Sequence, residues 1–341
     1  MSETDKKRLT PSATPWDTIP DDELEPSQLL VARSHRSMYG FRHESFDGDV
    51  DFFNAYGRDS CPLCGSESIQ KAGHARTGMQ RYLCKGCLRH FTPVTGTIFE
   101  NRKLPLAAWS DFLVQLFSYS SFELMTREDR RSDTTHPYWM AKLFAVLDGI
   151  QDKTVLSGLV LIDETYIPVA LRDATMVDGK LLRGLSRNQM CIGVGCDAEA
   201  SVFQWEGFGK TSTKKTIDTF GFRIQRGSHL THDMERGHAG IVRELGLTES
   251  VYNSKEVCKL PDRENPLAQV NTLCFLLKRF LKAHPGFKRD NLQGFLDLFY
   301  VIANPPDNKM EKAAFVLDRA MRNPNTLRFR EFYNVRTGNT L

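Results

Sequence analysis

The chain has 341 residues, of which 40% are hydrophobic and 26% charged, and its 45 Lys and Arg nearly balance 42 Asp and Glu. This length predicts about two domains of ~150 residues each, and the composition excludes a wholly disordered or fibrous protein. Its longest apolar runs fall well short of the roughly 20 residues that a membrane-spanning helix needs, and residues 1–10 lack the apolar stretch of a secretory signal. We therefore expect a soluble intracellular protein without a membrane partner.

Composition and periodicity change several times along the chain. The first thirty residues are rich in proline and acidic residues, which predicts a disordered tail. Strand-like runs begin near residue 155 and helical spacing follows them, which favours an α/β domain with a mixed sheet. The predicted segments are a disordered tail at 1–30, an N-terminal region with a cysteine unit at 31–98, a helical segment at 99–152, an α/β domain at 153–305 and a helical extension at 306–341.

The helical segment has apolar spacing of two helices around a polar connection. Residues 104–122 and 138–150 show the helical pattern, whereas 127–136 is charged and breaks it. This arrangement is compatible with a helix-turn-helix, although the pattern alone is too weak to establish one.

Two pairs of cysteines have the spacing of a four-thiolate metal site. Cys61 and Cys64 form one CxxC knuckle, Cys84 and Cys87 form another, and 19 residues separate the two. Tetrahedral Zn²⁺ takes four sulfur ligands at about 2.3 Å, and each knuckle presents two sulfurs on one side. Disulfides or a redox CxxC are the alternatives, which an intracellular chain and a duplicated motif disfavour. The sequence therefore predicts a structural zinc ribbon.

Positive charge gathers on the predicted ribbon. Residues 58–92 contain six basic residues against two acidic ones, with Tyr82, His90 and Phe91 among them. Basic side chains beside aromatic ones suit contact with nucleic-acid phosphates, and a solvated structural knuckle is the alternative. The basic residues that we expect to contact nucleic acid here are Lys71, Arg81, Lys85 and Arg89.

Residues 160–167 form an apolar, strand-like run that is interrupted by Asp163 and Glu164. Asp is depleted in strands, and a buried carboxylate is costly unless it is paired or binds a metal. Side chains alternate along a strand, so Asp163 shares a face with Leu161 and Thr165, whereas Glu164 points the other way. Asp163 is the preferred metal ligand because it lies deeper in the apolar run, and a locally paired carboxylate is the alternative.

A second candidate ligand ends another short strand-like run. Asp233 closes residues 228–233, just before a helical pattern that begins near residue 236. Strand ends that face helix starts are where α/β sheets bind ligands. Taken alone, Asp233 is explained equally well as a helix N-cap.

Residues 265–284 have the spacing of an amphipathic helix, with Cys274 on its broad apolar face. Asn271, Lys278 and Lys282 fall together on the other side, because steps of 7 and 11 residues return almost to the same helical angle. A plain solvated face would explain the lysines alone. With two isolated strand aspartates in the same domain, the Asn271 amide suits a metal ion and the lysines suit a phosphate backbone.

A series of short motifs also runs in order along roughly residues 52–335. They are CPLCG at 61–65, QRYLCKGC at 80–87, FTPVTGTIF at 91–99, KLPL at 103–106, IDETY at 162–166, LRGLSRNQ at 182–189, HD at 232–233, VNTL at 270–273, LKR at 277–279 and LQGFL at 292–296. In these motifs the chain resembles bacterial insertion-sequence transposases that carry a zinc ribbon before a DDE-type catalytic domain. The resemblance implies a ribonuclease H-like mixed sheet flanked by helices, preceded by a small zinc ribbon and a helical segment that binds DNA.

The resemblance also implies roles for individual residues. Asp163 and Asp233 match the first two acids of the family's metal-binding triad, and Asn271 stands where many relatives have Glu and some have Asn. Lys278 matches a basic residue thought to contact the transposon end. Because an amide carries no negative charge, this triad offers two formal charges instead of three, and a nearby acid such as Glu264 is an alternative ligand.

The residues and the resemblance together predict phosphoryl transfer at DNA ends. We expect a transposase that cleaves the terminal inverted repeats of an insertion sequence and joins them to target DNA by two-metal catalysis. The expected cofactors are structural Zn²⁺ and catalytic Mg²⁺ or Mn²⁺, and the expected partners are DNA and further copies of this chain. The expected location is the bacterial cytoplasm, at the nucleoid. The alternatives are a catalytically inactive zinc-ribbon regulator that binds DNA, and a ribonuclease H-like nuclease that cuts without specific ends.

Overall fold

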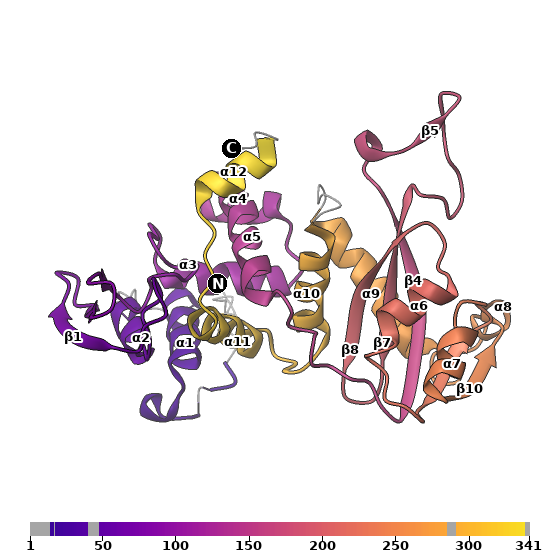
Figure 1. Ribbon diagram of the computed structural model, residues 1–341, viewed down its shortest axis with the longest axis horizontal. Coiled ribbons are helices and arrows are strands. Elements are labelled where there is room, and N and C mark those ends of the chain that lie inside the picture. Colours follow the sequence, from indigo (N-terminus) through magenta and orange to yellow (C-terminus); the bar gives the residue numbers. More distant parts are fainter. Residues whose placement is uncertain (1–13, 17, 40–47, 285–290, 338–341) are drawn as a thin grey trace, which may run out of the picture. The chain divides into compact units, whose positions relative to one another are not determined.

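The computed structural model describes residues 14–16, 18–39, 48–284 and 291–337, which form two compact units. The first unit combines the chain up to residue 146 with residues from 306 onward, and the second consists of residues 147–305 (Figure 1). Within the described ranges, every helix is too short or too polar to cross a bilayer.

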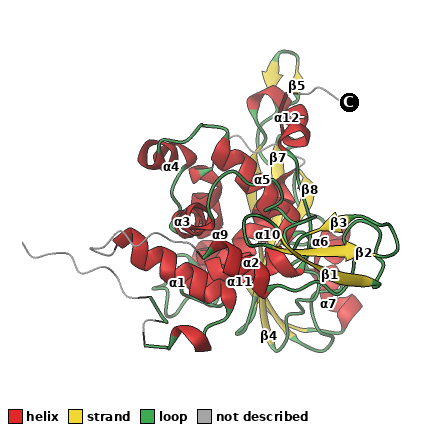
Figure 2. Cartoon of the chain, turned by 90° about the vertical axis from the view of Figure 1, so that its left-hand side faces the viewer, coloured by secondary structure: helices red, strands yellow, loops and turns green. Residues whose placement is uncertain are grey.

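Helices make up most of the first unit. They are a 3-10 turn η1 (Asp21–Glu23), α1 (Pro26–Tyr39), α2 (Asp49–Ala55), α3 (Leu106–Phe117), α4 (Phe122–Asp129), α5 (Thr135–Leu147), α11 (Lys309–Arg322) and α12 (Phe329–Thr337). Helix α1 packs against both α3 and α11, so the late helix α11 returns to the N-terminal part of the chain (Figure 2).

The N-terminal segment differs from the disordered tail that its composition predicts. Residues 1–13 and 17 of that tail lie outside the described residues. In the described part, Trp16 is only 4% exposed, and the expected tail runs into α1, where Leu30 and Val31 are buried. Packing against the rest of the unit supplies the apolar burial that orders this segment, and local composition does not reveal it.

The predicted break between the two mid-chain helices contains a further short helix. Helix α4 begins at Ser121, whose hydroxyl accepts a hydrogen bond from the Leu124 N–H, and it ends at Arg130 in the left-handed conformation. Its one buried side chain is Met125, because most of its surface is polar. Three consecutive helices, α3 to α5, therefore occupy the segment whose sequence pattern is compatible with a helix-turn-helix.

The cysteine unit is a small antiparallel sheet. Its strands are β1 (Ile69–His74), β2 (Gln80–Cys84) and β3 (His90–Phe91), in that spatial order (Figure 2). Tyr82 and Phe91 stack with ring centroids 5.3 Å apart, and they pack with Cys61 and Cys84 in a core of its own. So small a core suits a unit that depends on a further stabilising element such as a metal.

The second unit is built on a five-stranded mixed sheet in the order β10-β9-β4-β7-β8. The strands are β4 (Leu159–Pro168), β7 (Gln189–Cys196), β8 (Ser201–Phe208), β9 (His229–Asp233) and β10 (Thr248–Tyr252). β4, β7 and β8 form an antiparallel meander, while β9 and β10 are parallel to β4 and to each other. This order and these directions are those of the ribonuclease H-like fold, so the predicted fold class is confirmed.

Helices complete the second unit around that sheet. They are α6 (Thr213–Phe220), α7 (Ala239–Leu245), α8 (Ser254–Val257), α9 (Ala268–Ala283) and α10 (Leu292–Ala303), and a hairpin of β5 (Met176–Val177) and β6 (Lys180–Leu181) follows the turn η2 (Leu171–Asp173). Val160 and Ile162 of β4 share a core with Phe220 of α6 and Ile241 of α7. Helix α9 instead packs on β4 and β7, and α10 packs on β8.

Candidate metal and catalytic sites

The four ribbon cysteines converge on one point. All four sulfur atoms lie within 4.8 Å of one another, with Cys61 Sγ 3.8 Å from Cys87 Sγ and Cys64 Sγ 3.6 Å from Cys84 Sγ. Four sulfurs bound at about 2.3 Å to one tetrahedral ion would lie ~3.8 Å apart. The cysteines are not joined as disulfides. Their donor set and spacing therefore fit a zinc ion.

The surroundings of Cys87 favour the thiolate form that a metal requires. Hydrogen bonds from the backbone and side chain of Arg89 lower the pKa of Cys87 to about 6. A cationic donor beside a thiolate stabilises its negative charge. Arg89 is thereby engaged at the metal site itself, and it also donates to the Leu63 carbonyl.

The other basic residues of the ribbon occupy several surfaces. Lys71 and Lys85 are exposed and Arg81 is half-buried. Lys71 pairs with Tyr82 across the β1–β2 ladder, so alternation directs the neighbouring Arg81 to the opposite face. Arg58, which contributes to the positive total, donates instead to the Pro93 and Thr95 carbonyls.

In the second unit, Asp163 and Asp233 lie on neighbouring parallel strands. β4 and β9 pair as far as Leu161 opposite Thr231, two residues before each aspartate, and the negative charge of Asp233 acts on Asp163. In-register residues of adjacent strands project to the same face. The fold thus brings together the two aspartates that the sequence nominates, across a long stretch of intervening chain.

Asp163 is an unfavourable place for an isolated negative charge. Burial, together with the negative charges of Glu164 and Asp233, raises the pKa of Asp163 to about 7, even though the Glu164 N–H donates to its Oδ1. A cation at this position would remove the penalty, because an opposite charge favours the ionised form.

Asp233 does not cap the helix that follows it. Its Oδ1 accepts a hydrogen bond from the Glu235 N–H at 2.9 Å, and its side chain remains 29% exposed. The N-cap of α7 is His238, which makes no side-chain capping bond. The N-cap explanation for Asp233 is therefore wrong.

Helix α9 covers the face of β4 that carries Asp163. Cys274 is buried, and its Sγ lies 4.0 Å from Asp163 Oδ2. Asn271 is one turn before Cys274 and Lys278 one turn after it, and the positive charge of Lys278 acts on the Cys274 thiol. Asn271, Lys278 and the more distant Lys282 are all exposed.

The alternative third ligand, Glu264, lies in the loop before α9. Its side chain is 53% exposed, and its Oε1 is 3.2 Å from the Arg263 guanidinium. Asn271 belongs to the helix that contacts Asp163 through Cys274, whereas Glu264 lies outside that helix.

A network of polar side chains next to these carboxylates was not predicted from the sequence. Glu164 Oε1 accepts from His238 Nε2 at 2.8 Å, and the two side chains are only 4% and 0% exposed. His238 Nδ1 is 3.1 Å from His232 Nδ1, and His232 Nε2 is 3.1 Å from Glu249 Oε2. The signal was two histidines flanking Asp233, beside a glutamate directed away from Asp163.

Electrostatic interactions stabilise this network of side chains. Burial by itself would lower the pKa of His238, but the hydrogen bond and negative charge of Glu164 outweigh that effect and raise it. His232, Asp233 and His238 also place their donor atoms within 4.8 Å of one another, so they could share a metal ion. The network fixes the turn between β9 and α7, in which Asp233 lies.

No protein-family model matches this chain. Over 128 residues it is 31% identical to an uncharacterized protein in transposable element ISH50 of the archaeon Halobacterium salinarum. That match covers 37% of this chain and 42% of the archaeal protein, so the chain spans less than half of its relative's length. The resemblance pointed to bacterial elements, whereas this relative is archaeal.

Among solved structures, the chain matches one of a pre-cleavage Mos1 transpososome. The match covers 59% of this chain and 62% of the other, with a TM-score of 0.25 and 10% sequence identity. These values are too low to carry an argument about function.

Proposed function

We propose that this protein is a transposase that cleaves DNA at the terminal inverted repeats of an insertion sequence and joins the ends to target DNA. The observation that carries the proposal is that Asp163 and Asp233 lie on adjacent parallel strands of a ribonuclease H-like sheet, where the charge of Asp233 acts on Asp163. The similarity to a protein in a transposable element supports it.

In this proposal, Asp163 and Asp233 hold Mg²⁺ or Mn²⁺ through carboxylate oxygens, with the Asn271 amide oxygen as the third protein ligand. Hard cations of this kind take oxygen ligands, and when bound at such a site they activate the attacking oxygen and stabilise the leaving oxygen of a phosphoryl transfer. The buried Glu164–His238 pair positions the β9–α7 turn and, with it, Asp233.

DNA binding is divided between the two units in this proposal. Lys278 and Lys282 of α9 contact the phosphate backbone beside the carboxylates, and Lys71, Arg81, Lys85 and Arg89 contact it from the zinc-bound ribbon. Phosphate contacts of this kind position the DNA without reading its sequence. Several copies of the chain act together, because a transposition event joins two ends.

The test is a strand-transfer assay with purified protein, Mg²⁺ and DNA carrying the element's own ends. We expect Asp163→Ala and Asp233→Ala each to reduce cleavage and joining by at least roughly 10³-fold, since the lost metal stabilisation is worth several kcal/mol. Glu199→Gln, an exposed acid in the β7–β8 turn, is the matched control.

Three outcomes would replace the proposal. Full activity in either aspartate variant would remove these residues from catalysis. DNA binding without cleavage, indifferent to Asp163→Ala, would identify a zinc-ribbon regulator. Cutting that needs no specific ends and joins no strands would identify a ribonuclease H-like nuclease.

A further inference from the structure

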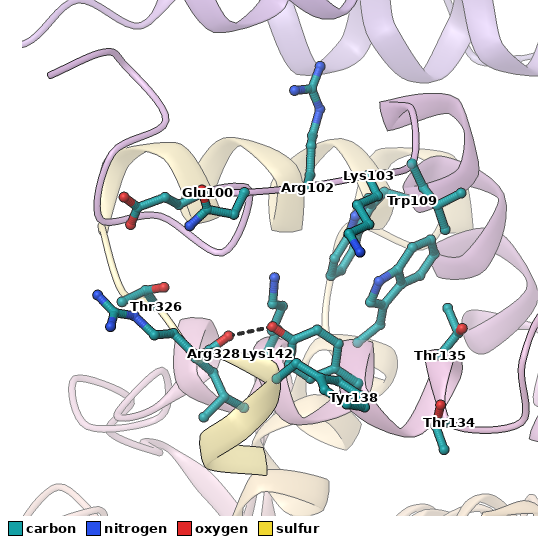
Figure 3. Close-up of a pocket in the computed structure, with 15 residues that line it drawn as sticks. Glu100, Arg102, Lys103, Trp109, Thr134, Thr135, Tyr138, Lys142, Thr326 and Arg328 are labelled. Atoms are coloured by element: carbon teal, nitrogen blue, oxygen red, sulfur yellow. Dashed lines mark hydrogen bonds between the residues drawn. The ribbon is translucent and has the colours of Figure 1, made fainter. Parts of the chain in front are cut away.

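The first unit contains a pocket of about 580 Å³ that the proposed chemistry does not use. It lies between the segment that carries Glu100 to Lys103 and helix α5, and residues 326–329 before and at the start of α12 form another wall (Figure 3). A volume of this size is typical of sites for small organic ligands.

Four cations line the pocket, namely Arg102, Lys103, Lys142 and Arg328. Arg102 pairs with Asp49 and is directed away from the pocket in Figure 3. Lys103 and Arg328 are exposed, and neither side chain has an ion-pair partner within the described part of the chain. Glu100, the one acid among the lining residues, accepts a hydrogen bond from the Gly96 N–H, and Glu331, outside the lining, accepts one from the Arg328 N–H. The net charge of the lining is therefore positive.

Lys142 is the most informative of these cations. It is 5% exposed, its Nζ donates to the Ile98 carbonyl, and it lies 4.7 Å from the centre of the Tyr138 ring. Burial lowers the pKa of Lys142 to about 8, and among the described residues no carboxylate offsets that burial. Burying an ammonium group without an opposite charge is costly, so an anion in the pocket would provide what the protein itself does not.

Aromatic surface adjoins these cations. Phe329 is 47% exposed and meets the Tyr138 ring edge to face, with centroids 5.2 Å apart. The Tyr138 hydroxyl donates to the Leu327 carbonyl, which holds the start of α12 against α5. Behind them, Trp109 and Trp139 stack with centroids 4.3 Å apart and make a rigid wall.

From this lining we infer that the pocket binds one unpaired nucleotide of a DNA strand, with its phosphate at Lys103, Lys142 and Arg328 and its base against Tyr138 and Phe329. Cations with adjoining aromatic faces are the combination by which proteins hold single strands, since every base can stack. A duplex is too wide to enter a pocket of this volume, whereas a single unstacked nucleotide fits. The choice of DNA over other aromatic anions rests on the proposed function.

The test measures fluorescence polarisation of a short labelled single strand and of the matched blunt duplex. The protein carries Asp163→Asn and the buffer lacks Mg²⁺, so cleavage plays no part. We expect Arg328→Gln and Lys103→Gln each to weaken single-strand binding by about tenfold, the usual effect of losing a charge-assisted hydrogen bond. Phe329→Ala should weaken it by roughly tenfold through lost stacking. Duplex binding should change little in all three variants.

Two further variants separate binding from structure. Arg330→Gln removes an exposed cation two residues from Arg328 that does not line the pocket, so single-strand binding should be unchanged. Lys142→Met keeps the length of the side chain without its charge, and it should retain the melting temperature while losing single-strand affinity.

Equal losses in Arg330→Gln, parallel losses on duplex DNA, or unchanged single-strand binding in the pocket variants would overturn the inference. If a single strand with abasic units binds as tightly as one with normal nucleotides, then the base does not contribute to binding in the pocket. If strand transfer fails but the pocket variants still weaken single-strand binding, the transposase proposal is wrong and the pocket inference stands. If strand transfer succeeds but the pocket variants bind single strands normally, only the pocket inference is wrong.

Discussion

The cysteine site and the carboxylate site are assembled in opposite ways. Two CxxC turns and one small antiparallel sheet place four sulfurs within 4.8 Å of one another. Asp163 and Asp233 come near each other only because β9 pairs in parallel with β4, and Asn271 belongs to α9, a helix later in the chain that packs on β4. The first site is local, with all four cysteines in one short segment, whereas the second depends on the whole domain and has a neutral residue, Asn271, as its proposed third ligand.

The largest difference should appear on removal of zinc. Cys61→Ser, or dialysis against a chelator, should release the metal and unfold the ribbon, because structural zinc supplies most of the stability of so small a core. Metal analysis and limited proteolysis across residues 58–97 would measure this, with Cys258→Ser as the control at an exposed cysteine. The second unit should keep its own melting transition. Zinc retained by Cys61→Ser at the wild-type content would refute the four-cysteine site.

The buried pair under the carboxylates should respond next most strongly. Glu164→Gln replaces a charged acceptor in a fully buried contact with His238, so we expect the free energy of unfolding of the second unit to fall by about 1–3 kcal/mol. Chemical denaturation monitored by circular dichroism would measure it. Glu244→Gln, an exposed position on α7, should have almost no effect. Equal stability of both variants would show that the pair contributes nothing to the fold.

The carboxylate site should also have a pH signature of its own. With a native pKa near 7 and an ordinary value near 3.8, Asp163 binds its proton more tightly in the folded state. Its contribution to stability is therefore present below about pH 4 and is lost as the pH rises through 7.

Asp163→Asn removes this titration. Without Mg²⁺, the melting temperature of the variant minus that of the wild type should increase between pH 4 and about pH 7 and stay constant above that. Differential scanning calorimetry across this range would test it. A pH-independent difference between the two proteins would mean that Asp163 is ionised throughout. Added Mn²⁺ should reduce the difference by stabilising only the wild type.

The smallest expected effect is on Mn²⁺ affinity when Asn271, the proposed third ligand, is changed. Asn271→Asp adds the negative charge that the carboxylate site lacks, so Mn²⁺ should bind several-fold more tightly, as measured by calorimetric titration. Thr272→Asp adds the same charge at the next exposed position of α9 and serves as the control. Equal gains in both variants would indicate general electrostatic attraction instead of ligation by residue 271.

The sequence predicted these regions unequally. The cysteine ligands follow from spacing alone, since a CxxC turn presents its two sulfurs whatever surrounds it. Asp163 could be predicted as a metal ligand because a carboxylate inside an apolar strand is costly unless it is paired or binds a metal. Support for Asp233 was weaker, because a helix N-cap explained this residue equally well. The short helix α4 was missed because its one buried side chain, Met125, leaves almost no apolar period.

The sequence by itself determined the four-thiolate cluster, the mixed α/β class and the alternation that turns Asp163 and Glu164 to opposite faces of β4. Only the tertiary structure decided that Asp233 lies near Asp163, that Glu164 is hydrogen-bonded to His238, and that Lys142 is buried without a counter-charge among the described residues. The reason is physical. Turn and strand geometry act over a few residues, whereas desolvation and charge pairing depend on which distant segments the fold brings into contact.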